Sequence, residues 1–121
     1  MSRVLIVDDS PTEMHILSGI LEQQGYTILS AVDGEKGVVA AREEQPDLIL
    51  MDVVMPGMNG FQATRLLSRD EATKHIPIII VTTKDQETDR VWGLRQGAKD
   101  YVTKPVSKDE LLTKIKNILG S

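Results

Sequence analysis

Five short apolar runs, separated by stretches with helical periodicity, constrain the fold of this chain more than any other feature of its sequence. The runs are mostly continuous rather than alternating, and they cover residues 4–7, 26–29, 48–51, 78–81 and 101–102. A continuous apolar run is typical of a strand buried on both faces, as in a parallel sheet covered by helices. The sequence therefore predicts an α/β fold of five strand-then-helix units, with one open parallel sheet and helices on both faces.

The stretches between the runs carry helix signals of their own. Ser10 precedes Pro11 and Glu13, an order that predicts an N-cap, a proline in the first turn and a capping-box glutamate. Apolar stripes follow at helical spacing, formed by Met14, Leu17, Ile20 and Leu21 in the first helix and by Leu111, Leu112, Ile115, Ile118 and Leu119 in the last. These stripes are the faces expected to pack on the sheet.

Length and composition narrow the class of protein. The chain has 121 residues, which suits one domain over 1–121 with no output domain. Its 14 basic against 18 acidic residues give a net charge of -4, which argues against a nucleic-acid surface. There is no cysteine, and the first apolar run is too short for a signal peptide or a membrane span. We therefore expect a cytoplasmic protein without membrane association.

Polar and charged residues follow four of the five apolar runs. Asp8 and Asp9 follow the first, Asp52 the third, Thr82 the fourth, and Lys104 lies just beyond the fifth. Ligands of open α/β sheets bind outside the carboxyl ends of the strands, so these side chains are expected to gather around one crevice.

The residue types in this crevice suit phosphoryl transfer onto an aspartate. Three close carboxylates repel one another, and a hard cation such as Mg²⁺ relieves the repulsion while accepting phosphate oxygens. A lysine adds positive charge, and a carboxylate can act as the nucleophile. Acyl transfer is disfavoured because no Ser or Cys nucleophile is paired with a His. Nucleotide binding has little support because no glycine-rich phosphate loop is present.

The chain resembles the receiver domains of two-component response regulators over essentially its whole length. Four segments carry the resemblance, in order and at strand ends: residues 7–10, 47–60, 78–83 and 97–105. The resemblance implies a three-layer, doubly wound (βα)5 flavodoxin-like sandwich with strand order 2-1-3-4-5. The opening segment 8–13 and the run 80–89 are similar to the small chemotaxis-type regulators of type IV pilus twitching motility.

The resemblance also implies a role for each site residue. Asp52 would be the phosphoacceptor, and Mg²⁺ would be held by Asp8, Asp9, Asp52 and the backbone carbonyl of Val54. Lys104 would pair with the phosphoryl group, and the Lys104–Pro105 peptide bond would be cis.

A switch would connect this site to a binding surface. Thr82 would move toward the phosphoryl group, and Tyr101 would turn inward when Thr82 leaves its space. The family usually has a small residue after the switch hydroxyl, whereas this chain has Thr83, whose extra atoms would narrow access to the site.

Two functions of different classes follow. In the first, a chemotaxis-type histidine kinase phosphorylates Asp52, and the face of the fourth helix, fifth strand and fifth helix changes its affinity for a protein target. The chain would be a monomer, and within this class it could instead act as a phosphate sink. The alternative is a Mg²⁺-dependent phosphohydrolase, which needs an acid two residues after the nucleophile, where this chain has Val54.

On the fourth helix, expected over 85–96, Val91 and Leu94 should face inward, with Trp92 either half-packed or presented to a partner.

Overall fold

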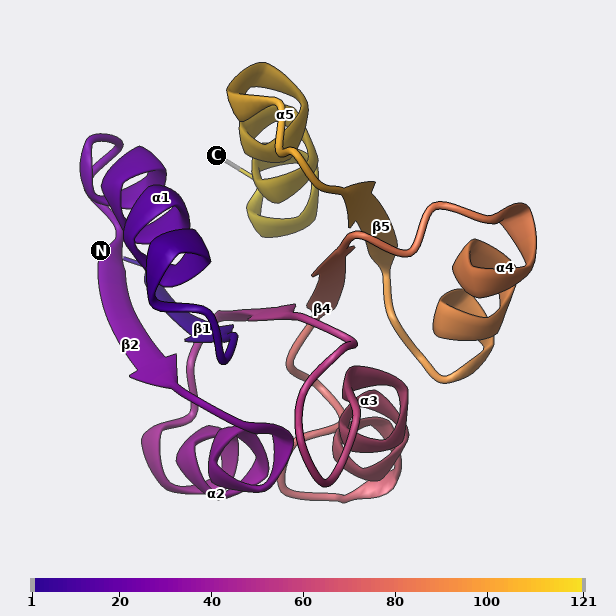
Figure 1. Ribbon diagram of the computed structural model, residues 1–121. Helices are drawn as coiled ribbons and strands as arrows, with labels where there is room; N and C mark the ends of the chain where they lie inside the picture. Colours follow the sequence, from indigo (N-terminus) through magenta and orange to yellow (C-terminus); the bar gives the residue numbers. More distant parts are fainter. Residues whose placement is uncertain (1, 121) are drawn as a thin grey trace.

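The computed structural model describes residues 2–120, and it contains five strands that alternate with five helices (Figure 1). Each strand coincides with one of the apolar runs to within two residues. The elements are β1 (Arg3–Val7), α1 (Pro11–Glu22), β2 (Thr27–Ala31), α2 (Gly34–Glu44), β3 (Leu48–Met51), α3 (Gly60–Arg69), β4 (Ile78–Thr82), α4 (Glu87–Arg95), β5 (Asp100–Thr103) and α5 (Lys108–Leu119).

The strands form one parallel sheet in the order β2-β1-β3-β4-β5, which confirms the predicted fold and strand order. The pairing register brings the strand ends into line. Val7 pairs with Met51, and Thr82 pairs with Thr103. The segments that follow β1, β3, β4 and β5 therefore leave the sheet at the same edge.

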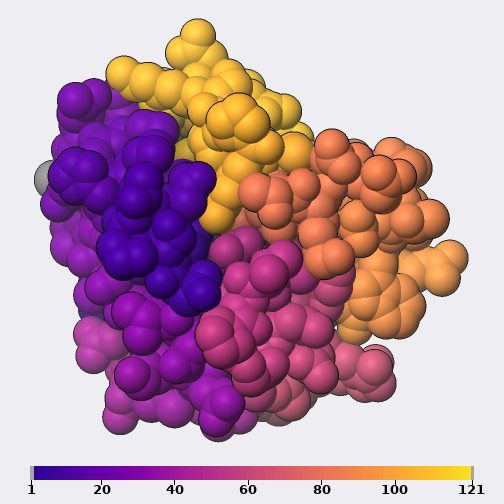
Figure 2. Space-filling model, in the orientation of Figure 1, coloured from indigo at the N-terminus to yellow at the C-terminus, as the bar shows by residue number. Residues whose placement is uncertain are grey.

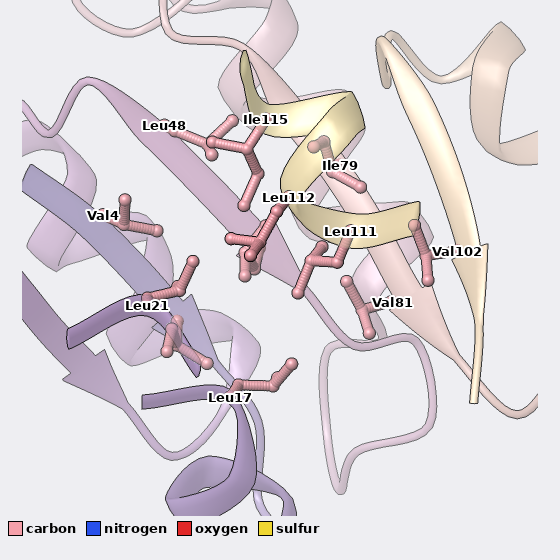
Figure 3. Close-up of a cluster of buried hydrophobic side chains, with 12 residues drawn as sticks. Val4, Leu17, Leu21, Leu48, Ile79, Val81, Val102, Leu111, Leu112 and Ile115 are labelled. Atoms are coloured by element: carbon pink, nitrogen blue, oxygen red, sulfur yellow. The ribbon is translucent and has the colours of Figure 1, made fainter. Parts of the chain in front are cut away.

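Alternate side chains of the strands supply the two faces of the sheet. One buried cluster lies between the sheet and helices α1 and α5, and Figure 3 shows Val4, Leu48, Ile79 and Val102 of the strands meeting Leu17, Leu21, Leu111, Leu112 and Ile115 of these helices. A second cluster, including Leu5, Ile49 and Ile78, lies against α2 and α3. Because every central strand is covered on both sides, its apolar run is continuous rather than alternating.

The helices confirm the predicted apolar stripes, but two details of the prediction were wrong, the capping box at Ser10 and the orientation of Val91. Ser10 caps α1, and its Oγ accepts the Glu13 N–H at 3.3 Å. The reciprocal half of the predicted capping box does not form, because the Ser10 N–H donates to Asp8 Oδ1 at 2.9 Å instead. On α4, Leu94 packs toward the core, but Val91 is 41% exposed, so its predicted inward orientation was wrong.

None of the helices within residues 2–120 combines the length and the apolarity that a membrane crossing requires.

Candidate functional site

The carboxyl ends of the central strands bring three carboxylates together. Asp8 and Asp9 follow β1, and Asp52 follows β3, so residues 43 positions or more apart in sequence become neighbours. One oxygen of each lies within 4.8 Å of the others. Asp8 and Asp52 are buried, whereas Asp9 is exposed. In Figure 2, the indigo, magenta, orange and yellow segments that carry these strand ends meet near the middle of the view.

Lys104 places a positive charge among these acids. Its Nζ lies 2.8 Å from Asp8 Oδ2 and 3.5 Å from Asp52 Oδ2, and its side chain is only 7% exposed. The Lys104–Pro105 peptide bond is cis, as predicted. Burial alone would lower the pKa of Lys104, but the hydrogen bond to Asp8 and the charges of Asp52 and Asp8 outweigh it and raise the pKa. The ammonium group therefore stays charged at neutral pH.

Asp52 is held in one orientation by the start of its own loop. Its Oδ1 accepts the Val53 N–H at 2.8 Å. Burial raises the pKa of Asp52, and the neighbouring charge of Asp8 adds to the rise, while Lys104 opposes it. The carboxylate is thus more costly to ionise than an ordinary aspartate, although an ammonium group lies beside it.

This donor set fits a hard divalent cation. Three carboxylates face one ammonium group, which leaves excess negative charge in a largely buried place. A cation such as Mg²⁺, which prefers oxygen ligands and retains water, would offset that excess, and the exposed position of Asp9 leaves the cluster open to solvent on one side.

The loop from β3 to α3 fixes the backbone next to Asp52. Asn59 caps α3, and its side chain and that of Gln62 form a reciprocal capping box. The Gly60 N–H donates to the Val53 carbonyl at 3.0 Å. A Cβ on Gly60 would lie 1.9 Å from the Asp52 carbonyl oxygen, so the backbone approaches more closely than any larger residue permits. The sequence contains no signal for this approach.

Thr82 and Tyr101 lie beyond the acids, on β4 and β5. Thr82 is fully buried, and its Oγ1 accepts the Lys84 N–H at 3.4 Å. Tyr101 is 5% exposed, and its hydroxyl donates to the Lys84 carbonyl at 2.7 Å. Burial raises the pKa of Tyr101 to about 12, with Asp89 and Asp85 contributing, so the hydroxyl keeps its proton.

Gly93 on α4 provides the space that the Tyr101 ring occupies. Thr82 and Tyr101 are both buried, and a Cβ on Gly93 would lie 3.2 Å from Cδ2 and Cε2 of the ring. The movement of the ring when Thr82 leaves its space stays a prediction. The missing side chain of Gly93 leaves room for the ring beside a buried Thr82.

The response regulator receiver domain family matches residues 4–116. The chain belongs to this family. The receiver identity agrees with the resemblance found in the sequence, and it establishes a function in two-component signal transduction.

Individual relatives support the same conclusion. The chain is 61% identical to Protein PilH of Pseudomonas aeruginosa over 120 residues, which is 99% of each chain. It covers only 26–51% of the length of further curated relatives that are 38–41% identical.

Solved structures with the same fold include a putative response regulator from Chloroflexus aurantiacus, with a TM-score of 0.94 and 32% identity over 99% of this chain and 98% of that one. The receiver domain of the sensor histidine kinase PA1611 from Pseudomonas aeruginosa, with a magnesium ion coordinated in its active-site cleft, has a TM-score of 0.91 and 32% identity over the same shares.

Val54 and Thr83, which follow β3 and β4, are both exposed. Val54, two positions after Asp52, presents an apolar side chain that is 57% exposed. A phosphohydrolase of the alternative type would need an acid at this position. Thr83 is also exposed, and its effect on access to the site stays a prediction.

Proposed function

We propose that this receiver accepts a phosphoryl group on Asp52 from a histidine kinase and thereby changes its affinity for a protein partner. The arrangement of Lys104 between Asp8 and Asp52 is the observation that supports it most strongly, because it places a charged ammonium group directly beside the proposed nucleophile. A structural ion pair would need only one acid, whereas three acids meet here.

The chemistry assigns each side chain a task. An oxygen of the Asp52 carboxylate attacks the phosphorus of a phosphohistidine, the new O–P bond forms, and the N–P bond breaks with its electrons going to the imidazole nitrogen. Lys104 offsets the negative charge of the transferred phosphoryl oxygens. The Val53 N–H holds the Asp52 carboxylate in place during the attack.

We further propose that the metal in this site is Mg²⁺, held by Asp8, Asp9, Asp52 and the backbone carbonyl of Val54. When bound, it neutralises charge that builds up on the transferring group. The close carboxylates and the magnesium-bound receiver of PA1611 support this assignment. Thr82, whose hydroxyl lies at the end of β4, supplies a hydrogen bond to the phosphorylated Asp52.

We infer the cellular process from likenesses in sequence. The identity of 61% to PilH over the full chain, together with segments 8–13 and 80–89, supports a role in chemotaxis-like control of type IV pilus twitching motility. The readout is a protein contact, or the chain acts as a sink that drains phosphoryl groups from a shared kinase. We propose that it works as a cytoplasmic monomer.

Intact-protein mass spectrometry tests the proposal. Wild type and Asp52→Asn are incubated with acetyl phosphate, with Mg²⁺ and with EDTA. We expect one phosphoryl adduct on wild type, only with Mg²⁺, and none on the variant. An adduct that persists on Asp52→Asn would show that another residue is the acceptor. The absence of an adduct on wild type would refute the proposal.

A further inference from the structure

Two adjoining hollows lie where the β3–α3 loop and α3 meet α4. One, of about 500 Å³, is lined by residues that include Val54, Phe61, Lys84 and Trp92. The other, of about 120 Å³, is lined by residues that include Phe61, Arg65 and Trp92. Because Phe61 and Trp92 belong to both, the hollows form one surface, here called the α3–α4 surface. Figure 2 shows the magenta and orange segments that border it side by side.

The α3–α4 surface combines apolar anchors with positive charge. Val54 and Trp92 are 57% and 49% exposed, and both line the larger hollow. Arg65 and Lys84 are exposed, and neither takes part in an ion pair within residues 2–120. No aspartate or glutamate lines either hollow, although acids outnumber bases in the chain.

On the opposite flank of α4, β5 and α5 offer a partner fewer exposed apolar side chains than the α3–α4 surface does. Among the described residues, no large apolar side chain of β5 or α5 is exposed. Tyr101 is buried, and Lys114 is engaged by Asp100 Oδ1 at 2.8 Å and by the Tyr101 carbonyl at 3.3 Å. The face of α4, β5 and α5 therefore lacks the aromatic anchor that the other flank provides.

The α3–α4 surface is also connected to the acidic site through Lys84 and Val54. Val54 follows Asp52 by two residues. The Lys84 N–H contacts Thr82 Oγ1, and the Lys84 carbonyl accepts the Tyr101 hydroxyl. A movement of Thr82 toward a phosphoryl group would release the Lys84 N–H and shift a residue that lines the larger hollow. The surface can thus respond to the state of Asp52.

We propose that the α3–α4 surface binds an acidic segment of a partner protein, with an aromatic or aliphatic side chain of that segment seated between Phe61 and Trp92. Carboxylates of the segment pair with Arg65 and Lys84, which supplies the charge complementarity. The response of this contact to phosphorylation rests on the proposed function of Asp52, whereas the surface itself does not.

A peptide selection tests the assignment. A library of random displayed peptides is selected against the full chain with Mg²⁺, once with beryllium fluoride as a phosphoryl mimic and once without it. We expect the beryllium fluoride selection to enrich peptides in which acidic residues flank an aromatic or aliphatic one. Calorimetry should show their affinity falling roughly tenfold or more with Trp92→Ala and with Arg65→Glu. Ile16→Ala, at an exposed position of α1, is the matched control and should leave affinity unchanged.

Reversing one charge on each side separates a direct contact from a folding defect. A selected peptide whose acidic residue is changed to lysine should regain affinity for Arg65→Glu, and all variants should retain the wild-type circular dichroism spectrum. Selection of basic peptides would overturn the proposal, and so would peptides whose affinity is unchanged by Trp92→Ala and Arg65→Glu. So would self-association of the chain that Trp92→Ala abolishes, because a second copy would then cover the surface.

Peptide binding to the α3–α4 surface and phosphorylation of Asp52 can fail separately. If wild type forms the Mg²⁺-dependent phosphoryl adduct but yields no peptide dependent on Trp92, the α3–α4 assignment is wrong and Asp52 remains the acceptor. If peptides dependent on Trp92 bind equally with and without beryllium fluoride, the coupling through Lys84 is refuted. If no adduct forms, the proposed function fails independently of the peptides.

Discussion

Gly60→Ala is expected to destabilise the protein strongly, because the added Cβ meets backbone that has little freedom to move. The Cβ would lie 1.9 Å from the Asp52 carbonyl oxygen and 2.8 Å from Val53 Cα. The Asp52 oxygen must retreat by about 1.5 Å to reach the 3.4 Å at which ordinary contact begins. Overpacking against backbone belongs at the upper end of the usual range, so we expect a loss of about 3 kcal/mol in unfolding free energy.

Gly19→Ala provides the matched control in the same chain. Gly19 lies in α1, and no heavy atom within 4 Å would meet its Cβ. Alanine is the better helix former, so this variant should be more stable by about 1 kcal/mol. The same chemical change is therefore expected to have opposite effects at the two positions.

Urea unfolding followed by circular dichroism measures both variants against wild type. We also expect weaker Mg²⁺ binding by Gly60→Ala, since the displaced loop carries Asp52 and the Val54 carbonyl, which we propose as ligands. The reasoning would be refuted if Gly60→Ala lost less than about 0.5 kcal/mol, or if Gly19→Ala lost as much as Gly60→Ala.

Three further predictions concern Tyr101, the pH dependence of stability and Mg²⁺ binding. Tyr101→Phe should cost about 1 kcal/mol of unfolding free energy, because it leaves the Lys84 carbonyl without its 2.7 Å donor, and a urea midpoint equal to wild type would contradict this. Burial alone would raise the pKa of Asp100, but the hydrogen bond from Lys114 and other favourable interactions outweigh burial and lower the pKa. The ionised Asp100 therefore contributes to stability above its unfolded pKa of 3.8, and this contribution is lost as the pH falls through its folded pKa. Urea titrations should accordingly show wild type more stable than Asp100→Asn by less than about 1 kcal/mol at pH 7, with the gap closing in acid, and a constant gap would argue against it. Without Mg²⁺, Asp9→Asn should have an unfolding free energy within about 0.5 kcal/mol of wild type because Asp9 is exposed. With Mg²⁺ at ten times its Kd, wild type should gain about 1.4 kcal/mol of unfolding free energy, and Asp9→Asn should not. A preserved gain would exclude Asp9 as a ligand.

The fold and the meeting of the site residues could be predicted because both depend on sequence patterns with a direct physical cause. A strand covered on both faces needs a continuous apolar run, and parallel strands bring their carboxyl ends to one edge. These two rules place Asp8, Asp9, Asp52, Thr82 and Lys104 together without any knowledge of contacts.

Other features depend on close tertiary approaches that leave no periodic signal. Val91 is apolar and was expected to face the core, but Gly93 takes the inward position because the Tyr101 ring needs that space. Similarly, the pattern at Ser10 predicts a capping box, but it cannot show that Asp8 competes for the Ser10 N–H. In both places a contact with Tyr101 or Asp8 determined the local structure.

Trapping the phosphorylated side chain tests the central claim most directly. The chain is phosphorylated with acetyl phosphate and Mg²⁺, the acyl phosphate is reduced with borohydride to homoserine, and the peptides are mapped by mass spectrometry. We expect homoserine at position 52 and none at positions 8 or 9. Homoserine at either of those positions, or an unmodified Asp52 in a chain that carries a phosphoryl group, would contradict it.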